Sequence, residues 1–366
     1  MDPPPRLFLL GAGFSKPAGL PLAAELVPLL LEVGDRHFST RDGYNHLRNA
    51  IEGYREYLEE TNPGTPFDLE SFGAWLDWEH VLRLKGSDTF SEHGNEAGLQ
   101  LRWAIGKVLF DRCPADIPEL YLEFARRLTT RDRVMTLNYD LLLERALEAV
   151  GLPYRRFPGR FSEVHEFYAT WDSDQPEELV ILKLHGSIDW TYSSGQASQD
   201  VLGLQPQPLV QGPRPEGDGL TRVAVIAPHA LPYYYAEHNF WWRNPTLLLP
   251  PSTAKPLAGS PLIPLWDGVG LYANTLGGFT VIGCSLPPGD PYVLQLVHHI
   301  ATDYACNRPR EMSWPQARMK LVDYRPTEAG RNELMQRYRF MTPEHTDVLL
   351  DGLTLESLDR IFDGAV

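Results

Sequence analysis

Five apolar segments of the chain each end in small or polar residues of the types that bind ligands or transfer protons. These ends are Gly11-Ala12-Gly13-Phe14-Ser15, Asn138-Tyr139-Asp140, His185-Gly186-Ser187, Gly283-Cys284-Ser285 and Asp323. The carboxyl ends of parallel strands meet at one edge of a sheet, and ligands bind there, where the strand order reverses. We therefore expect side chains that lie far apart in the sequence to converge on one cleft.

The first of these ends is typical of a nucleotide-binding unit. An apolar run over 7–10 is followed by Gly11 and Gly13, and then by a helical pattern over 22–31. Glycines allow a tight turn and a close approach of the backbone to a pyrophosphate. The full dinucleotide fingerprint has a third glycine where Lys16 stands, so this stretch alone also fits a plain glycine turn.

Four of the polar residues also have an ordinary structural interpretation. Asp140 suits the N-cap of a helix that begins at Leu141. Asn138 and Ser285 suit turns, and His185 suits a hydrogen-bonded position in the core. Because such residues recur at five strand ends, a shared site explains them better than separate coincidences do.

Composition limits the class of protein. The chain has 366 residues, 43% of them hydrophobic and 22% charged, which is typical of a soluble globular protein. Its formal net charge is -15, which disfavours direct binding of nucleic acid. The apolar stretch 20–33 is short and interrupted by Glu25 and Glu32, so we expect no membrane association.

Cysteine usage indicates the compartment and argues against a metal. The three cysteines, Cys113, Cys284 and Cys306, are widely spaced and form no Cys-x-x-Cys pair, so no thiolate zinc cluster is expected. A secretory signal has a basic region before its apolar run, and the amino terminus of this sequence shows no such region. We expect a cytoplasmic protein without a metal ion.

The pattern of apolar residues predicts an α/β fold, a Rossmann-like parallel sheet with an inserted helical subdomain and a proline-rich loop module, and no zinc module. We expect one domain over 1–366 with a core of 6–34, 132–190 and 222–325, a helical insert at 35–131, the proline-rich module at 191–265, and a helical, acidic tail at 326–366. We also expect a helix over 266–276. An aromatic cluster at 233–235 and 240–242 suits a packed loop module or a protein interface better than a stacking platform.

Four motifs resemble those of the sirtuin-like family. They are GAGFS at 11–15, TLNYD at 136–140, KLHGSIDW at 183–190 and IGCSLPPGDPYV at 282–293. The resemblance is closer to the bacterial branch than to protein deacetylases, because the four-cysteine zinc module and the acyl-lysine-binding segment of the deacetylases are not recognisable. Relatives that lack both features are often NAD-cleaving effectors of anti-phage defence.

The resemblance implies NAD as the ligand and a role for each matching residue. Gly11 and Gly13, with Ala12 and Phe14 in the same loop, would approach the pyrophosphate, and Ser15 would bond a phosphate oxygen. Gly283 and Ser285 would lie along the adenosine side, with Asp323 near adenosine. Asp140 would accept from the nicotinamide carboxamide, Asn138 would hold the ribose or an attacking water, and His185 would be the general base.

The function implied by the resemblance is hydrolysis of NAD to nicotinamide and ADP-ribose, as the toxic effector of an anti-phage system. The alternatives are a zinc-free NAD-dependent deacylase, an ADP-ribosyltransferase, or a module that binds NAD or ADP-ribose without catalysis. We expect regulation by assembly, as a homo-oligomer or with a separately encoded sensor or ATPase protein.

Overall fold

The computed structural model describes most of the chain. The described residues are 4–38, 45–84, 95–156, 161–164, 169–171, 177–192, 223–236, 245–252, 262, 265–266, 269–270, 272–287, 289–306 and 314–363. Most of the predicted proline-rich module and the aromatic residues at 240–242 lie outside these ranges.

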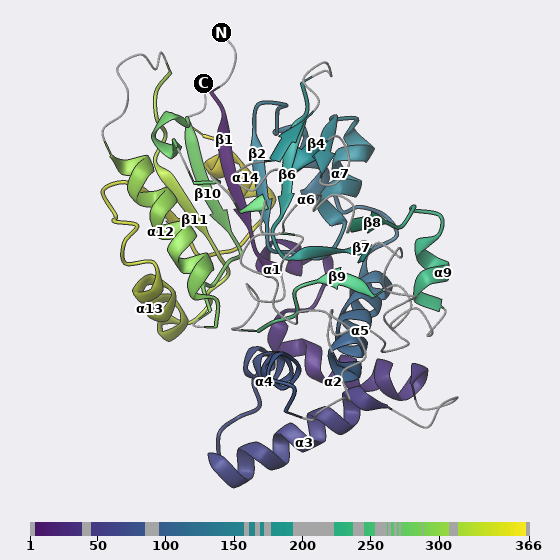
Figure 1. Cartoon of the computed structure of the whole chain (residues 1–366). Helices are drawn as coiled ribbons and strands as arrows, with labels where there is room; N and C mark the ends of the chain where they lie inside the picture. The colour runs from purple at the N-terminus through teal and green to yellow at the C-terminus, as the bar shows by residue number, and fades with distance from the viewer. Residues whose placement is uncertain are drawn as a thin grey trace.

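A seven-stranded sheet forms the centre of the fold (Figure 1). Its order is β12 (Thr346–Leu349), β11 (Met319–Val322), β10 (Gly278–Ile282), β1 (Arg6–Leu10), β2 (Arg133–Thr136), β6 (Leu179–Lys183) and β3 (Tyr154–Arg156). Every neighbouring pair is parallel. The chain passes from β1 to β2 on one side and returns through β10 on the other, so the strand order reverses at β1. The predicted Rossmann-like α/β class is confirmed.

Alternation along β1 explains why helices cover both faces of this sheet. Phe8 and Leu10 belong to one buried cluster, which they share with α6 (Glu119–Arg126), α7 (Leu142–Val150) and α14 (Leu355–Phe362). Leu7 and Leu9 belong to a second cluster, which they share with α12 (Pro291–Ala305). A strand whose side chains are buried on both faces reads as a continuous apolar run, as 7–10 does.

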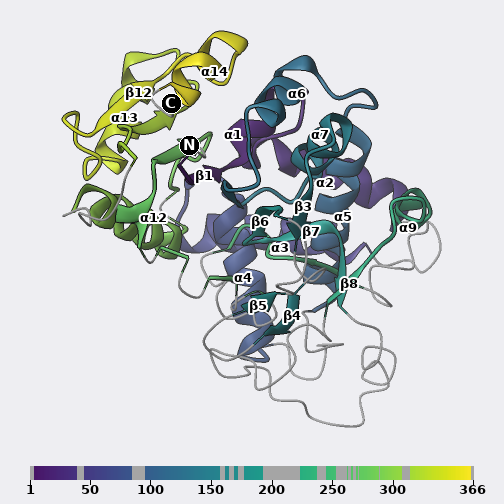
Figure 2. The ribbon, with the colours of Figure 1, turned by 90° about the horizontal axis from the view of Figure 1, so that it is seen from above.

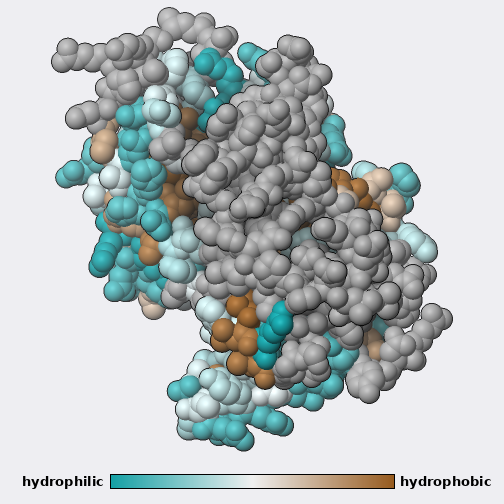
Figure 3. Space-filling model, viewed as in Figure 1, coloured by the Kyte–Doolittle hydropathy of each residue, from teal (hydrophilic) through white to brown (hydrophobic). Residues whose placement is uncertain are grey.

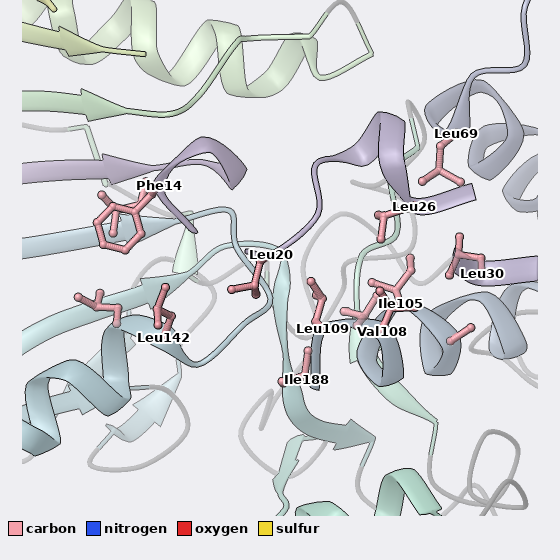
Figure 4. Packing of buried hydrophobic residues seen from close by; sticks show 14 of the residues in the cluster. Phe14, Leu20, Leu26, Leu30, Leu69, Ile105, Val108, Leu109, Leu142 and Ile188 are labelled. Atoms are coloured by element: carbon pink, nitrogen blue, oxygen red, sulfur yellow. The ribbon is translucent and has the colours of Figure 1, made fainter. Parts of the chain in front are cut away.

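The residues between β1 and β2 form the predicted helices. They are α1 (Ala12–Ser15), α2 (Ala23–His37), α3 (His46–Thr61), α4 (Leu69–Val81), α5 (Glu96–Arg112) and α6. Asn45, Asp68 and Asn95 cap α3, α4 and α5 through their side chains. Figure 1 shows α2 to α5 beyond the carboxyl ends of the strands, and the first buried cluster continues from the sheet into them (Figure 4).

A smaller antiparallel sheet extends from the end of β6. It consists of β7 (Gly186–Tyr192), flanked by β8 (Val223–Val225) and β9 (Thr246–Leu248). A separate hairpin joins β4 (Phe161–Val164) and β5 (Ala169–Trp171). The short helix α9 (Leu231–Ala236) carries part of the aromatic cluster, and Tyr235 packs against Trp103 and Phe110 of α5. Tyr234 and Tyr235 therefore belong to the core, whereas Tyr233 is exposed.

Two local predictions were wrong. The tail contains α13 (Glu328–Arg337) and α14 as expected, but β12 lies between them and joins the sheet (Figure 2). Its ends, Thr346 and Leu349, are buried and its middle is half-buried. This pattern is short and lies between two helical segments, so it is hard to recognise in the sequence. The described residues of 266–276 form turns and a 3-10 turn at Ala273–Thr275, where Tyr272 has a left-handed φ of 62°.

Apolar side chains are exposed at the carboxyl end of α4, where Trp78 and Leu82 are 44% and 59% exposed. Hydrophobic surface is visible in this region in Figure 3. Within the described ranges, no single helix is long and apolar enough to cross a membrane, and one bent pair, Ala12–Ala18 with Ala23–His37, passes by length and composition only.

Candidate functional site

The glycine-rich ends of β1 and β10 are in direct backbone contact. The amide of Gly13 donates to the carbonyl of Gly283 over 2.9 Å. Gly283 has a left-handed φ of 64°, and a Cβ atom added there would lie 2.3 Å from the Gly13 carbonyl carbon. A Cβ atom added at Gly11 would lie 2.5 Å from the Gly283 carbonyl oxygen. These glycines are therefore required by the packing of the two loops, a role that the sequence pattern did not indicate.

The ends of β1 and β2 are joined by a chain of buried polar side chains. The Asn138 side-chain amide donates to Ser15 Oγ over 3.1 Å, and Ser15 Oγ donates to Asp140 Oδ2 over 2.9 Å. All three residues are less than a tenth exposed. Asp140 Oδ1 also accepts from the backbone amide of Leu142 over 3.0 Å at the start of α7. Asp140 is therefore not the N-cap as predicted, since Leu141 has that position, but its carboxylate accepts from the first amide of the helix as well as from Ser15.

Burial raises the pKa of Asp140 above its ordinary value, although Lys183 and the two hydrogen bonds act in the opposite direction. Lys183 Nζ donates to the Asp140 carbonyl oxygen over 2.5 Å. In the protein without a ligand, the charged form of the buried Asp140 carboxyl group is therefore disfavoured.

This pKa direction predicts how stability depends on pH in Asp140→Asn. A carboxyl group with a raised folded-state pKa stabilises the fold at low pH, and that contribution is lost as pH rises from the unfolded value of about 4 through the folded value. The neutral amide has no such loss, so the variant should gain in free energy of unfolding relative to wild type between pH 4.5 and pH 8. Urea unfolding at both pH values measures the difference. A variant that becomes relatively less stable at pH 8 would contradict the direction.

His185 follows β6 and is held by the backbone on both sides. The amide of Leu249 donates to the His185 carbonyl over 2.8 Å. Gly186 has a φ of 91°, and a Cβ atom there would lie 2.3 Å from the Leu247 carbonyl oxygen. The imidazole is 3% exposed and stacks on Trp266 with ring centroids 5.9 Å apart. Its place depends on long-range contacts with β9 that are not visible in the sequence.

Tyr139 connects His185 to the polar chain. It lies between Asn138 and Asp140, its ring centroid is 6.5 Å from that of His185, and its hydroxyl donates to the Leu249 carbonyl. Its own carbonyl accepts from the amide of Ile188 over 3.0 Å. The expected convergence of the β2 and β6 ends is confirmed by these contacts.

Tyr292 contacts His185, and Asp290 is linked to His185 through Tyr292; neither is among the predicted site residues. Tyr292 Oη lies 3.0 Å from His185 Nε2, and Tyr292 also donates to Asp290 Oδ1 over 3.1 Å. Both residues belong to the quoted motif at 282–293, but His185, which Tyr292 contacts, is more than a hundred positions earlier in the chain. The motif indicated that this region belongs to the site, but it did not indicate the contact with His185.

Ser285 and Asp323 lie beyond β10 and β11, on the other side of β1 from His185. The Ser285 carbonyl accepts from Arg337 over 3.0 Å. Asp323 accepts from its own neighbours, the Tyr324 amide over 2.7 Å and Arg325 over 3.1 Å. These contacts hold both residues to the β10 and β11 side of the sheet.

Helix α4 of the insert borders the site. A Cβ atom added at Gly73 would lie 1.9 Å from the Pro251 carbonyl oxygen, and one added at Gly289 would lie 2.1 Å from Glu70 Oε2. The insert is thus in close contact with the segment after β9 and with the segment that carries Asp290.

A buried ionic network lies beneath the polar chain. Glu144 of α7 accepts from Lys183 over 3.0 Å and from Arg156 over 3.1 Å. Arg156 also pairs with Asp189 over 2.5 Å, and Asp189 accepts from Ser187 over 2.6 Å. Within the described residues, no group of three or more His, Cys, Asp or Glu side chains could hold a metal ion.

Comparison with known proteins gives one family match. The model of the SIR2-like domain matches residues 132–204. No curated protein matches the chain. Among solved structures, one of Sir2Tm bound to a propionylated peptide has 13% identity and a TM-score of 0.31, covering 99% of this chain and 93% of that one. A mutant Sir2 homologue in complex with ADP-ribose has 13% identity and a TM-score of 0.32, covering 98% and 91%.

The family match is local and covers the segment with Asn138, Asp140 and His185. Residues 132–204 are therefore similar to the SIR2-like domain, whereas Ser15 and Tyr292, which contact residues of this segment, lie outside it.

Proposed function

We propose that the chain binds NAD at the carboxyl edge of the sheet and hydrolyses it to nicotinamide and ADP-ribose. The observation that supports this most is the linked group Asn138, Ser15 and Asp140 beside His185. Asn138, Asp140 and His185 lie within the segment that matches the SIR2-like domain. A binding module would need no imidazole next to a buried amide and carboxyl group.

Each group has a role in the proposed reaction. The loop of Gly11, Ala12, Gly13, Phe14 and Ser15 would face the phosphates, and Asp140 would accept from the nicotinamide carboxamide. Gly283, Ser285 and Asp323 would line the adenosine side.

The bond between the ribose and the nicotinamide nitrogen breaks, and nicotinamide leaves as a neutral ring. A water held by Asn138 forms the new bond to the ribose carbon. His185 takes the proton of that water and releases it to solvent.

Hydrolysis and transfer to an acyl group differ in the second reactant. A deacylase must bind an acylated peptide as well as NAD, whereas a hydrolase requires only one placed water. The segment by which sirtuin deacetylases hold the peptide is not recognisable in this chain. We therefore favour water as the nucleophile, with deacylation or ADP-ribosyl transfer as the alternative.

The reaction type can be tested with Asn138→Ala. We expect wild type to release nicotinamide without any peptide, and the variant to be slower by about a hundredfold, because a misplaced nucleophile costs about that much. Affinity for NAD should change little. Asn62→Ala, at the exposed end of α3, is the control. Nicotinamide release that requires an acylated peptide, with acyl-ADP-ribose as product, would favour the deacylase.

We propose a cellular role on the same basis. The chain would act as a toxic effector of anti-phage defence that depletes NAD, controlled by self-assembly or by a separately encoded sensor or ATPase. This proposal rests on the motif resemblance. Light scattering of the purified protein, with NAD measured in infected cells, tests it, and an active monomer at all concentrations would remove the reason to invoke assembly.

A further inference from the structure

The hydroxyl of Tyr292 connects His185 to a buried carboxylate. It lies 3.0 Å from His185 Nε2 and 3.1 Å from Asp290 Oδ1. His185 and Asp290 are 3% and 5% exposed. Asp290 is the N-cap residue of α12, yet its side chain makes no capping hydrogen bond. The carboxylate is therefore used for Tyr292 and not for the helix end.

The chemistry of a phenol decides which group donates in each of the two hydrogen bonds of Tyr292. The hydroxyl has one proton, and an ionised carboxylate can only accept. Burial raises the pKa of Tyr292 far above its ordinary value, and Asp290 and Tyr139 raise it further, so the phenol stays protonated. Tyr292 then donates to Asp290 and accepts from His185, which places the ring proton on Nε2 and the lone pair on Nδ1.

The charged and titratable groups around His185, Tyr292 and Asp290 come from several elements. Asp290 and Tyr292 lie at the start of α12, and Tyr139 follows β2. Glu70 of α4 and Asp290 both raise the pKa of Tyr292 and of Tyr139, while Arg102 of α5 lowers the pKa of Tyr139. Two carboxylates therefore face this region, and both favour a positive imidazole.

We propose that Tyr292 and Asp290 are positioning residues for His185, which fix the orientation of its ring and stabilise the imidazolium formed when it accepts a proton. The inference deepens the proposed function and rests on it. During hydrolysis the proton of the attacking water moves to Nδ1, Nε2 keeps its proton, and Asp290 stabilises the added charge through Tyr292. The proton then leaves to solvent, and no other reactant is required.

The first test needs no substrate. In protein carrying carbon-13 histidine, the His185 signal is assigned from its loss in His185→Gln and followed against pH in the absence of NAD. Asp290→Asn should lower the pKa of His185 by about one unit, because it removes a nearby opposite charge. Tyr292→Phe should lower it as well, because it removes the hydroxyl that accepts from Nε2 and links the ring to Asp290. Asp290→Glu should restore most of the shift. Asp303→Asn, on the same helix, is the matched control.

The second test measures nicotinamide release. Protonated His185 cannot act as a base, so activity rises with pH through its pKa. In Asp290→Asn and Tyr292→Phe the acid limb of kcat should move to lower pH, and kcat should fall about tenfold with little change in KM. A merely structural role would leave the acid limb in place.

The two tests separate the inference from the proposed function. An unchanged His185 titration in both variants overturns the inference, whatever the activity. A shifted titration in a wild-type protein that cleaves no NAD supports the coupling of Asp290 to His185 and overturns the proposed reaction instead. Circular dichroism checks that each variant is folded. If Asp290→Asn is not folded, Asp290→Glu keeps the test decisive.

Discussion

Replacing His185 with alanine is expected to lower NAD cleavage by about 10²–10⁴-fold, the usual contribution of a general base. The protein should remain folded, because the main-chain contacts of this position do not involve the ring. Its carbonyl accepts from Leu249, and Gly186 supplies the unusual backbone angle that follows. The variant removes the ring contacts with Trp266, Tyr292 and Tyr139. Nicotinamide release by purified protein is the measurement.

His299→Ala is the matched control for this variant. His299 is an exposed histidine on α12, away from the carboxyl ends of the strands, and its loss should leave NAD cleavage unchanged. If His185→Ala cleaved NAD within a few-fold of wild type while remaining folded, His185 would be a hydrogen-bonded core histidine, as its burial alone would also permit.

The centre of the sheet could be predicted from the sequence because its strands are buried on both faces. Runs such as 7–10 and 179–182 are continuously apolar, which is typical of parallel strands under helices. The edge strands could not be predicted in this way. β3 has the sequence Tyr-Arg-Arg with every residue half-buried, and β12 includes Asp347, so neither shows the apolar run. Their pairing with β6 and β11 depends on a sheet that already exists.

The site shows the same division between local and long-range information. Residue type and position at a strand end identified Asn138, Asp140 and His185, because the carboxyl ends of parallel strands meet. Tyr292 and Asp290 lie where a loop becomes a helix, and the contact of Tyr292 with His185 joins two segments that are far apart in the sequence. The mutual packing of Gly13 and Gly283 is likewise a contact between loops far apart in the sequence.

The network around Glu144 gives the largest expected effect on stability. Burial alone would raise the pKa of Glu144, but Lys183 and Arg156 outweigh it, and the pKa lies below its ordinary value. The carboxylate is therefore charged and shared between two buried cations. Glu144→Gln keeps the shape and removes the charge, leaving Lys183 and Arg156 with Asp189 as the remaining anion in the network. Removing one partner of a buried ion pair costs about 3–5 kcal/mol, because a buried charge is left uncompensated.

We expect the free energy of unfolding of Glu144→Gln at pH 7 to fall by about that amount, as measured by urea denaturation. Adding Lys183→Met balances the charges again and should recover part of the loss, whereas two independent contacts would give additive losses. Because the folded-state pKa is lowered, the wild-type advantage is present above the unfolded value of about 4.3 and disappears as pH falls through the folded value. Glu32→Gln, in an exposed pair with Arg36, should have little effect. A Glu144→Gln protein as stable as wild type would mean that its charge contributes nothing net, and the double variant would then be the less stable one.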